Sequence, residues 1–480
     1  MNNFKYLFLF SFLLSNGIYD ISSQNTGQLW ELRLNHEFSN LKNKRSVEYH
    51  LDEKKLISTL TRSPLINKKE RSDILMDFPS PEGKFISYEM YESPVMPQYL
   101  AEKYSMIKTY TGRGLDNPND RVSVTIKNNE IKGLILCRYG RIFIEPIPNK
   151  EGIYRVSYSE NQLDPFKKKN DCSGIDYDCM VIRSDSENKQ LRDRDFPYCV
   201  GEPQPCYTIG DTLVTFRYAA ILTAEANNSV ADGTVEGGLA WIAAMANQVN
   251  LVWVRELSFK LELIENNDML IYTDANPTPE LFTSHDMYTE LPRVLIHLTE
   301  VIGPGGFGVS QDNLLWEYGA VFNTGYGGGL AYVPGSTSAN LPSYAVHIHE
   351  IGHNLGSGHN CTSENGWRSS FGGTAMCNRG NTLPGSYGDQ YSSHTIDIAI
   401  RYQQDMFSYN NYDYQRGWIR EPSGNIIPGV MVPESGFFIP KETPFILEGS
   451  AIDSDEDDLL TYSWEQNDAS DISFSPPDFP

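Results

Sequence analysis

Residues 346–361 read VHIHEIGHNLGSGHNC, and within them His349, His353 and His359 stand at fixed offsets around Glu350. On a helix, His349 and His353 are four residues apart, so their imidazoles project from one face, one turn apart. Two ligands of a single zinc ion need this separation. The spacing therefore predicts a metal site built on a helix.

The surrounding residues predict how the helix begins and how the third histidine returns to the site. We expect the helix to begin near Pro342, because apolar residues recur at helical spacing on one side of it: Tyr344, Ile348, Ile351 and Leu355. Gly356 allows the backbone to leave the helix in a left-handed conformation, which would bring His359 back as a ligand. Three protein nitrogens leave one zinc position open, as in catalytic sites. His347 is one residue off the ligand face and is expected to support the ligands or to lie on the surface.

Outward from this stretch, strands and helices alternate. Residues 212–222 (TLVTFRYAAIL) and 258–266 (SFKLELIEN) read as strands on either side of a long helix over 234–257. A second helix is expected over 287–303 and stops at the pair Gly303-Pro304. Such alternation predicts one α/β domain over residues 210–410.

Charge divides the chain near residue 210. Residues 24–209 hold 28 Lys and Arg against 27 Asp and Glu, whereas residues 210–480 hold 10 against 34. So acidic a second half repels phosphates, which argues against nucleic acid and anionic membrane as partners. Acidity that serves only solubility is the simplest interpretation.

The flanking segments predict export and further domains. Residues 1–23 have the layout of a secretory signal peptide with cleavage after Ser23, and no later segment is apolar enough to anchor the chain in a membrane. The nearly neutral, strand-rich region 24–209, which contains short basic stretches, is expected to be a β-rich propeptide. After a linker over 411–427, residues 428–480 read as the start of a β-sandwich module that the chain does not complete.

An acidic run, DSDEDD (453–458), lies in this last module. It is not an EF-hand loop, because Asp458 stands at the sixth position and Trp464 at the twelfth. A turn that binds Ca²⁺ and a simple solvated turn both remain open.

The motif HEIGHNLGSGH resembles the zinc signature of the metzincin proteases. That family also has a methionine in a tight turn beneath the metal, and FGGTAMCNRG (371–380) supplies Met376. The stretches TFRYAAILTAE, ENNDMLIYTDA and VFNTGYGGGLAYVP are similar to the secreted bacterial reprolysin-like branch, which is related to adamalysins. The resemblance covers residues 210–410 and implies a zinc endopeptidase of protein or peptide substrates. Glu350 would then be the general base that deprotonates a zinc-activated water.

The stretch GGGLAYVP (327–334) resembles the substrate-binding edge strand of the family. Its central residues Gly329, Leu330 and Ala331 would pair with an extended peptide through main-chain hydrogen bonds. An ordinary internal strand is the alternative.

Cysteines form two groups in an exported chain, where disulfides are expected. A disulfide between Cys361 and Cys377 would join the third ligand to the methionine turn. Five cysteines lie upstream, an odd number that leaves room for one free thiol, and Cys137 falls in an apolar strand.

The resembled family often stays inactive because a propeptide cysteine binds the open zinc position. Cys172, on a polar and basic loop, is the candidate for this cysteine switch. The alternatives are an ordinary disulfide or one of three other residues: Cys179, Cys199 and Cys206.

A second function class stays open. The chain could be a binding or adhesion protein that carries a vestigial protease domain. Casein digestion with and without a zinc chelator would separate the two.

Overall fold

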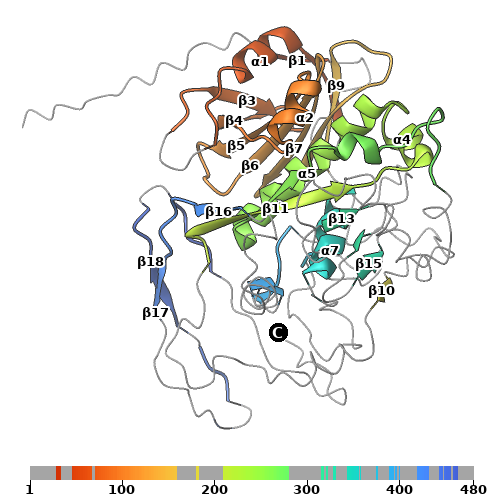
Figure 1. Cartoon of the computed structure of the whole chain (residues 1–480). Helices are drawn as coiled ribbons and strands as arrows, with labels where there is room; N and C mark the ends of the chain where they lie inside the picture. Colours follow the sequence, from red (N-terminus) through yellow and green to blue (C-terminus); the bar gives the residue numbers. More distant parts are fainter. Residues whose placement is uncertain are drawn as a thin grey trace, which may run out of the picture.

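The computed structural model of the protein contains two large β-sheets on either side of one long helix, α5 (Val235–Leu257) (Figure 1). It describes residues 29–33, 46–66, 71–158, 180–182, 209–279, 315–317, 321–322, 328–330, 343–355, 357, 374–376, 389–393, 395–396, 399–400, 419–431, 440, 443–446, 448–455 and 458–462. The predicted signal peptide and the helix expected over 287–303 lie outside these residues.

The first sheet is antiparallel throughout and has the strand order β1-β2-β9-β8-β7-β6-β5-β4-β3. Its strands are β1 (Trp30–Leu32), β2 (Ser46–Leu51), β3 (Leu75–Pro79), β4 (Phe85–Glu92), β5 (Ile107–Gly114), β6 (Arg121–Lys127), β7 (Glu130–Cys137), β8 (Gly140–Pro146) and β9 (Ile153–Tyr158). Two short helices accompany it, α1 (Glu53–Leu60) and α2 (Gln98–Lys103). The described part of residues 24–209 is therefore β-rich, as the sequence predicts.

The second sheet is mixed and has the order β10-β15-β14-β13-β11-β12. Its strands are β10 (Met180–Ile182), β11 (Thr212–Ala220), β12 (Phe259–Leu263), β13 (Leu315–Glu317), β14 (Val321–Phe322) and β15 (Gly328–Leu330). β11 is parallel to β12 and β13, and α5 connects β11 to β12, so the predicted α/β character of this domain is confirmed. A further strand, β16 (Ile419–Pro422), pairs antiparallel with β11, although it lies in the predicted linker.

Helix α5 has clear start and stop signals. The Thr234 hydroxyl accepts the N–H of Gly237 at 2.9 Å, and Glu236 in the first turn suits the positive end of the helix dipole. The helix ends at Ser258, whose φ of 56° is left-handed. Most residues between these ends are buried, as expected for a helix packed on more than one side.

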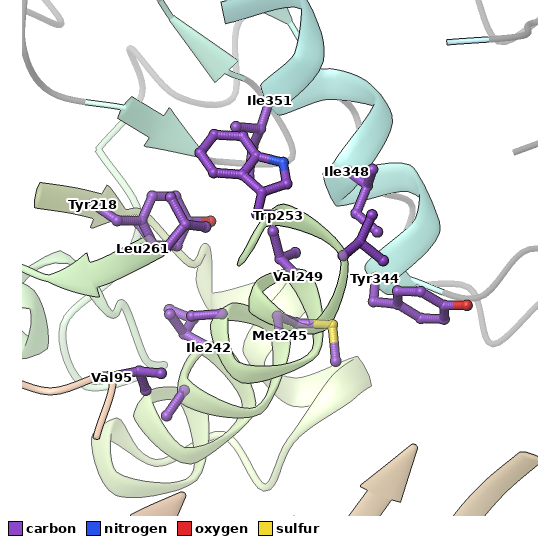
Figure 2. Close-up of a cluster of buried hydrophobic side chains, with 14 of the residues drawn as sticks. Val95, Tyr218, Ile242, Met245, Val249, Trp253, Leu261, Tyr344, Ile348 and Ile351 are labelled. Atoms are coloured by element: carbon purple, nitrogen blue, oxygen red, sulfur yellow. The ribbon is translucent and has the colours of Figure 1, made fainter. Parts of the chain in front are cut away.

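The two sheets share a core across α5. Val95, from the segment after β4, and Leu134, from β7, belong to the same buried cluster as the α5 residues Ile242 and Val249. Figure 2 shows Val95 on one side of α5 and the start of α7 (Ser343–Asn354) on another. The opposite face of the first sheet has a core of its own, to which α1 contributes Leu56.

The remaining elements are short. They are α4 (Ala224–Val230), the 3₁₀ helix η3 (Asn267–Leu270) and the antiparallel pair β17 (Gly429–Met431) and β18 (Ser450–Ile452). Within the described parts of residues 428–480 only this two-stranded sheet is present, so the predicted sandwich module stays a prediction. None of the described helices is long and apolar enough to cross a membrane.

The acidic run near β18 takes part in protein contacts. Asp455 accepts the N–H of Ile426 at 2.8 Å, and Asp458 pairs with Arg113 of β5 at 2.8 Å. Asp458 therefore connects this region to the first sheet, and Asp455 connects it to the predicted linker.

Candidate metal centre

Helix α7 carries the two helical ligands predicted for the metal. It spans Ser343–Asn354, so His349 and His353 stand one turn apart on it, and the expected start near residue 342 is confirmed. The four residues of its predicted apolar side are fully buried: Tyr344, Ile348, Ile351 and Leu355. Tyr344, Ile348 and Ile351 are labelled in Figure 2, where they lie with α5 residues in one apolar cluster. This packing fixes the orientation of α7.

His349 is held in one tautomer. Its side chain is fully buried, and its Nδ1 atom lies 2.8 Å from the carbonyl oxygen of Ala375. Because a carbonyl oxygen only accepts hydrogen bonds, Nδ1 carries the proton and donates it. Nε2 then keeps its lone pair, as zinc-binding histidines require. The tautomer of His349 is therefore the one that a zinc ligand needs.

The predicted methionine turn lies directly against the ligand helix. Met376 is fully buried, and a Cβ atom added to Gly352 would overlap its Sδ atom and lie 3.2 Å from its Cε atom. Any side chain at position 352 would have to displace Met376, so glycine allows α7 to approach the turn this closely. Since Gly352 precedes His353 in the chain, this contact fixes the level of the second ligand along the helix.

Tyr391 connects α5 to α7. Its hydroxyl accepts the Nε1–H of Trp253 and donates to the carbonyl oxygen of Ile348, both at 2.8 Å. Burial raises the pKa of Tyr391, so the hydroxyl stays protonated and can donate. The carbonyl that receives this bond belongs to the residue before His349.

Asp389 ties the same region to the first sheet. Its two carboxylate oxygens accept the hydroxyl of Tyr344 at 2.7 Å and Nε of Arg141, on β8, at 2.7 Å. Burial, and then the negative charge of Asp389, raise the pKa of Tyr344 well above its usual value. Tyr344 is therefore a neutral donor at the N-terminal end of α7.

The chain just after α7 is also held in place. The N–H of Ser357 donates to the carbonyl oxygen of Gly352 at 3.1 Å, and its hydroxyl lies 3.1 Å from that of Thr395. Ser357 is fully buried. These bonds fix the chain two residues before His359, the predicted third ligand.

His347 is buried against α5 and does not lie on the surface. Its ring meets that of Trp241 edge-on, with 5.7 Å between centroids, and only 3% of the residue is exposed. The surface alternative for His347 is therefore wrong, because the side chain packs toward the neighbouring helix.

The predicted substrate strand lies between two other strands. Gly329 and Leu330 belong to β15, which pairs with β14 on one side and with β10 on the other, antiparallel in both cases. In β10, Met180 is opposite Leu330 and Val181 is opposite Gly329. A segment from the predicted propeptide thus occupies the hydrogen-bonding edge that was assigned to a peptide substrate.

Cys137 is the free cysteine among the described residues. It lies on β7, half-buried, as its apolar strand predicts, and burial raises the pKa of its thiol. The candidate disulfide of Cys361 with Cys377 and the candidate switch Cys172 lie outside the part of the chain that the structure describes.

The described side chains supply only part of the predicted metal-ligand set. The side chains of Glu350 and His353, the whole of His359 and the third strand residue Ala331 lie outside the described residues. Among the side chains that are described, no group of three or more His, Cys, Asp or Glu could hold a metal. The evidence that these residues suit zinc is therefore the tautomer of His349 and the position of His353 one helical turn later on α7.

Sequence reasoning missed Gly352, Tyr391 and Asp389. A glycine inside an otherwise regular helix is a weak signal of close packing, and it could have drawn attention to Gly352. Tyr391 and Asp389 have no such local signal, because their partners are far away in the sequence.

Comparison with known proteins gives one family. The description "Metallo-peptidase family M12B Reprolysin-like" matches residues 215–417, close to the domain expected over 210–410. No curated protein sequence matches the chain. The matched segment includes most of β11, all of α5 and α7, and all three predicted histidine ligands.

Proposed function

We propose that this chain, which belongs to the reprolysin-like metallopeptidases of family M12B through residues 215–417, is a secreted zinc endopeptidase. The observation that carries the proposal is the hydrogen bond from His349 Nδ1 to the Ala375 carbonyl. This bond places the proton on Nδ1 of a buried imidazole at the first position of the HExxH motif, so Nε2 is the nitrogen that would bind a metal.

Three histidines would hold the metal: His349, His353 and His359. When bound, zinc polarises a peptide carbonyl and makes water acidic enough to lose a proton near neutral pH. Glu350 accepts that proton as general base and returns it to the leaving amine. The buried side of α7 holds His349 in place meanwhile, because the helix cannot rotate without breaking its core.

The substrate would be a protein or peptide bound in extended form along β15. Main-chain hydrogen bonds to Gly329 and Leu330 would hold it, as β10 illustrates by pairing with the same residues. An extended substrate and β10 would compete for this edge.

This competition supports latency as part of the proposal. Residues 24–209 would act as a propeptide in which β10 covers the substrate strand until it is displaced. A cysteine thiolate would occupy the open zinc position. Cys172 remains a candidate, and Cys179 becomes a second one because it directly precedes the strand residue Met180.

The experiment is digestion of casein by the secreted, processed protein with and without a zinc chelator. Loss of cleavage on chelation and its return with added zinc are the expected results. A protein that binds zinc yet cleaves nothing, even after processing, would overturn the proposal. That result would favour a binding or adhesion protein with a vestigial domain.

A further inference from the structure

An ion pair between the buried Arg141 and the partly buried Asp389 joins the first sheet to a segment beside the predicted metal centre. We propose that Arg141 of β8 is a positioning residue for the zinc ligand His349, acting through Asp389 and the backbone of the methionine turn. The inference rests on the proposed zinc site and adds a role for the N-terminal sheet in it.

Arg141 is placed like a core residue. It is 4% exposed, its Nε lies 2.7 Å from Asp389 Oδ2, and its guanidinium lies 5.6 Å from the centroid of the Tyr344 ring. The ring of Phe143, also on β8, lies 6.1 Å from that of Tyr344. With the Tyr344 hydroxyl on Oδ1, both oxygens of Asp389 have donors, so the carboxylate has a single orientation.

Two hydrogen bonds connect this carboxylate segment to the ligand. The carbonyl oxygen of Gln390, the residue after Asp389, accepts the N–H of Ala375 at 2.7 Å. The carbonyl oxygen of Ala375 accepts Nδ1–H of His349 at 2.8 Å. Ala375 therefore donates its N–H to Gln390 and accepts the Nδ1–H of His349 with its carbonyl oxygen.

The segment 389–391 is also fixed by α5. Arg255 donates to the carbonyl oxygen of Asp389, and the N–H of Tyr391 donates to Glu256 at 3.3 Å. These bonds hold the backbone of the segment, whereas Arg141 and Tyr344 hold the Asp389 side chain. Removing Arg141 would leave the partly buried carboxylate of Asp389 without this cation, and the segment would move to hydrate it.

Such a movement would lower the affinity for zinc, because it shifts the carbonyl group that orients His349. Loss of a partner that orients a zinc ligand typically lowers metal affinity by 10–100-fold. Arg141 acts two hydrogen bonds farther away, so we expect about tenfold, the lower end of that range.

The N-terminal sheet would stay bound to the catalytic domain after the chain between them is cut. It contacts the catalytic domain as a core does: Val95 accepts the N–H of Leu263 on β12 at 2.7 Å, and the Asn247 side chain of α5 donates to the carbonyl oxygen of Tyr110 on β5 at 3.1 Å. Cleavage of the connecting residues 159–208 would therefore leave the sheet bound, with Arg141 still on Asp389.

The test compares Arg141→Met with Asn247→Ala in the full chain. Both variants weaken the contact between the first sheet and the catalytic domain, but of the two residues only Arg141 touches the segment that leads to His349. Zinc dissociation constants are measured by competition with a zinc chelator, and unfolding midpoints of the zinc-free chains are measured in parallel.

We expect both variants to unfold earlier, while Arg141→Met raises the zinc dissociation constant about tenfold and Asn247→Ala changes it by less than about twofold. Equal zinc affinities in the two variants would overturn the proposal and leave Arg141 a purely structural residue. Absence of zinc binding by the wild type would instead overturn the proposed function.

A second variant keeps the test valid if Arg141→Met does not fold. Asp389→Asn keeps the shape and an acceptor for Tyr344 but removes the charge that Arg141 binds. It must raise the zinc dissociation constant in the same direction, and an unchanged value would also overturn the proposal.

Discussion

Alanine at position 352 tests whether Met376 packs directly beneath the ligand helix. The added Cβ would overlap Sδ of Met376 and lie 3.5 Å from a ring carbon of Tyr391. Overpacking a filled core costs about 1–3 kcal/mol. Alanine inside a helix gains about 1 kcal/mol over glycine. Gly352→Ala should therefore lower the free energy of unfolding by about 0–2 kcal/mol.

In a chain that already carries Met376→Ala, Gly352→Ala should raise the free energy of unfolding instead of lowering it. Met376→Ala alone should cost about 2–5 kcal/mol, because the side chain is fully buried. In the double variant the Cβ at position 352 no longer meets sulfur, so the helix gain of alanine returns. The double variant should be more stable than the sum of the single changes by about 1–3 kcal/mol.

The assay is urea unfolding of the zinc-free full chain, followed by tryptophan fluorescence. Met245→Ala on α5 serves as the matched control, because this buried methionine is not among the nearest atoms that a Cβ on Gly352 would meet. The changes in the free energy of unfolding caused by Met245→Ala and Gly352→Ala should add. If Gly352→Ala and Met376→Ala also add within about 0.5 kcal/mol, the direct contact is refuted.

Three further predictions concern chemistry, support and latency. Glu350→Gln should keep zinc but cleave peptides about 10²–10⁴-fold more slowly, and a rate within about tenfold of wild type would contradict its role as base. Tyr391→Phe should lower the free energy of unfolding by about 1–3 kcal/mol in urea, because the buried N–H of Trp253 loses its acceptor; an unchanged midpoint would refute this. The unprocessed wild type should be inactive, whereas the precursor of Cys172→Ala or Cys179→Ala should cleave a short peptide that does not have to displace β10; silence of both variants on that peptide would exclude these thiols as the switch.

The elements that the sequence predicts best are those with a regular apolar pattern. The helix over 234–257 and the strands beside it have local signals, including the Thr234 cap, and the structure contains all three. Helix α7 was predicted in the same way, and the ligand spacing on it follows from helix geometry alone. These features depend on residues that are close together in the chain.

The supports of the site could not be predicted because they join distant segments. Arg141 meets Asp389 across 248 positions, and Trp253 meets Tyr391 across 138. No periodicity connects such pairs, and each residue alone looks like an ordinary member of its strand, helix or loop. The pairing of β10 with β15 has the same origin, since a three-residue strand has too little pattern to reveal its partner.

Metal analysis of the wild type and of His349→Ala tests the central claim most directly. After dialysis, the wild-type chain should hold about one zinc ion, because in the proposed site three histidines would bind it and the Ala375 carbonyl orients the first of them. His349→Ala should lose nearly all of it while the first sheet, measured by circular dichroism, stays folded. A His349→Ala protein that keeps its full zinc content would contradict the account.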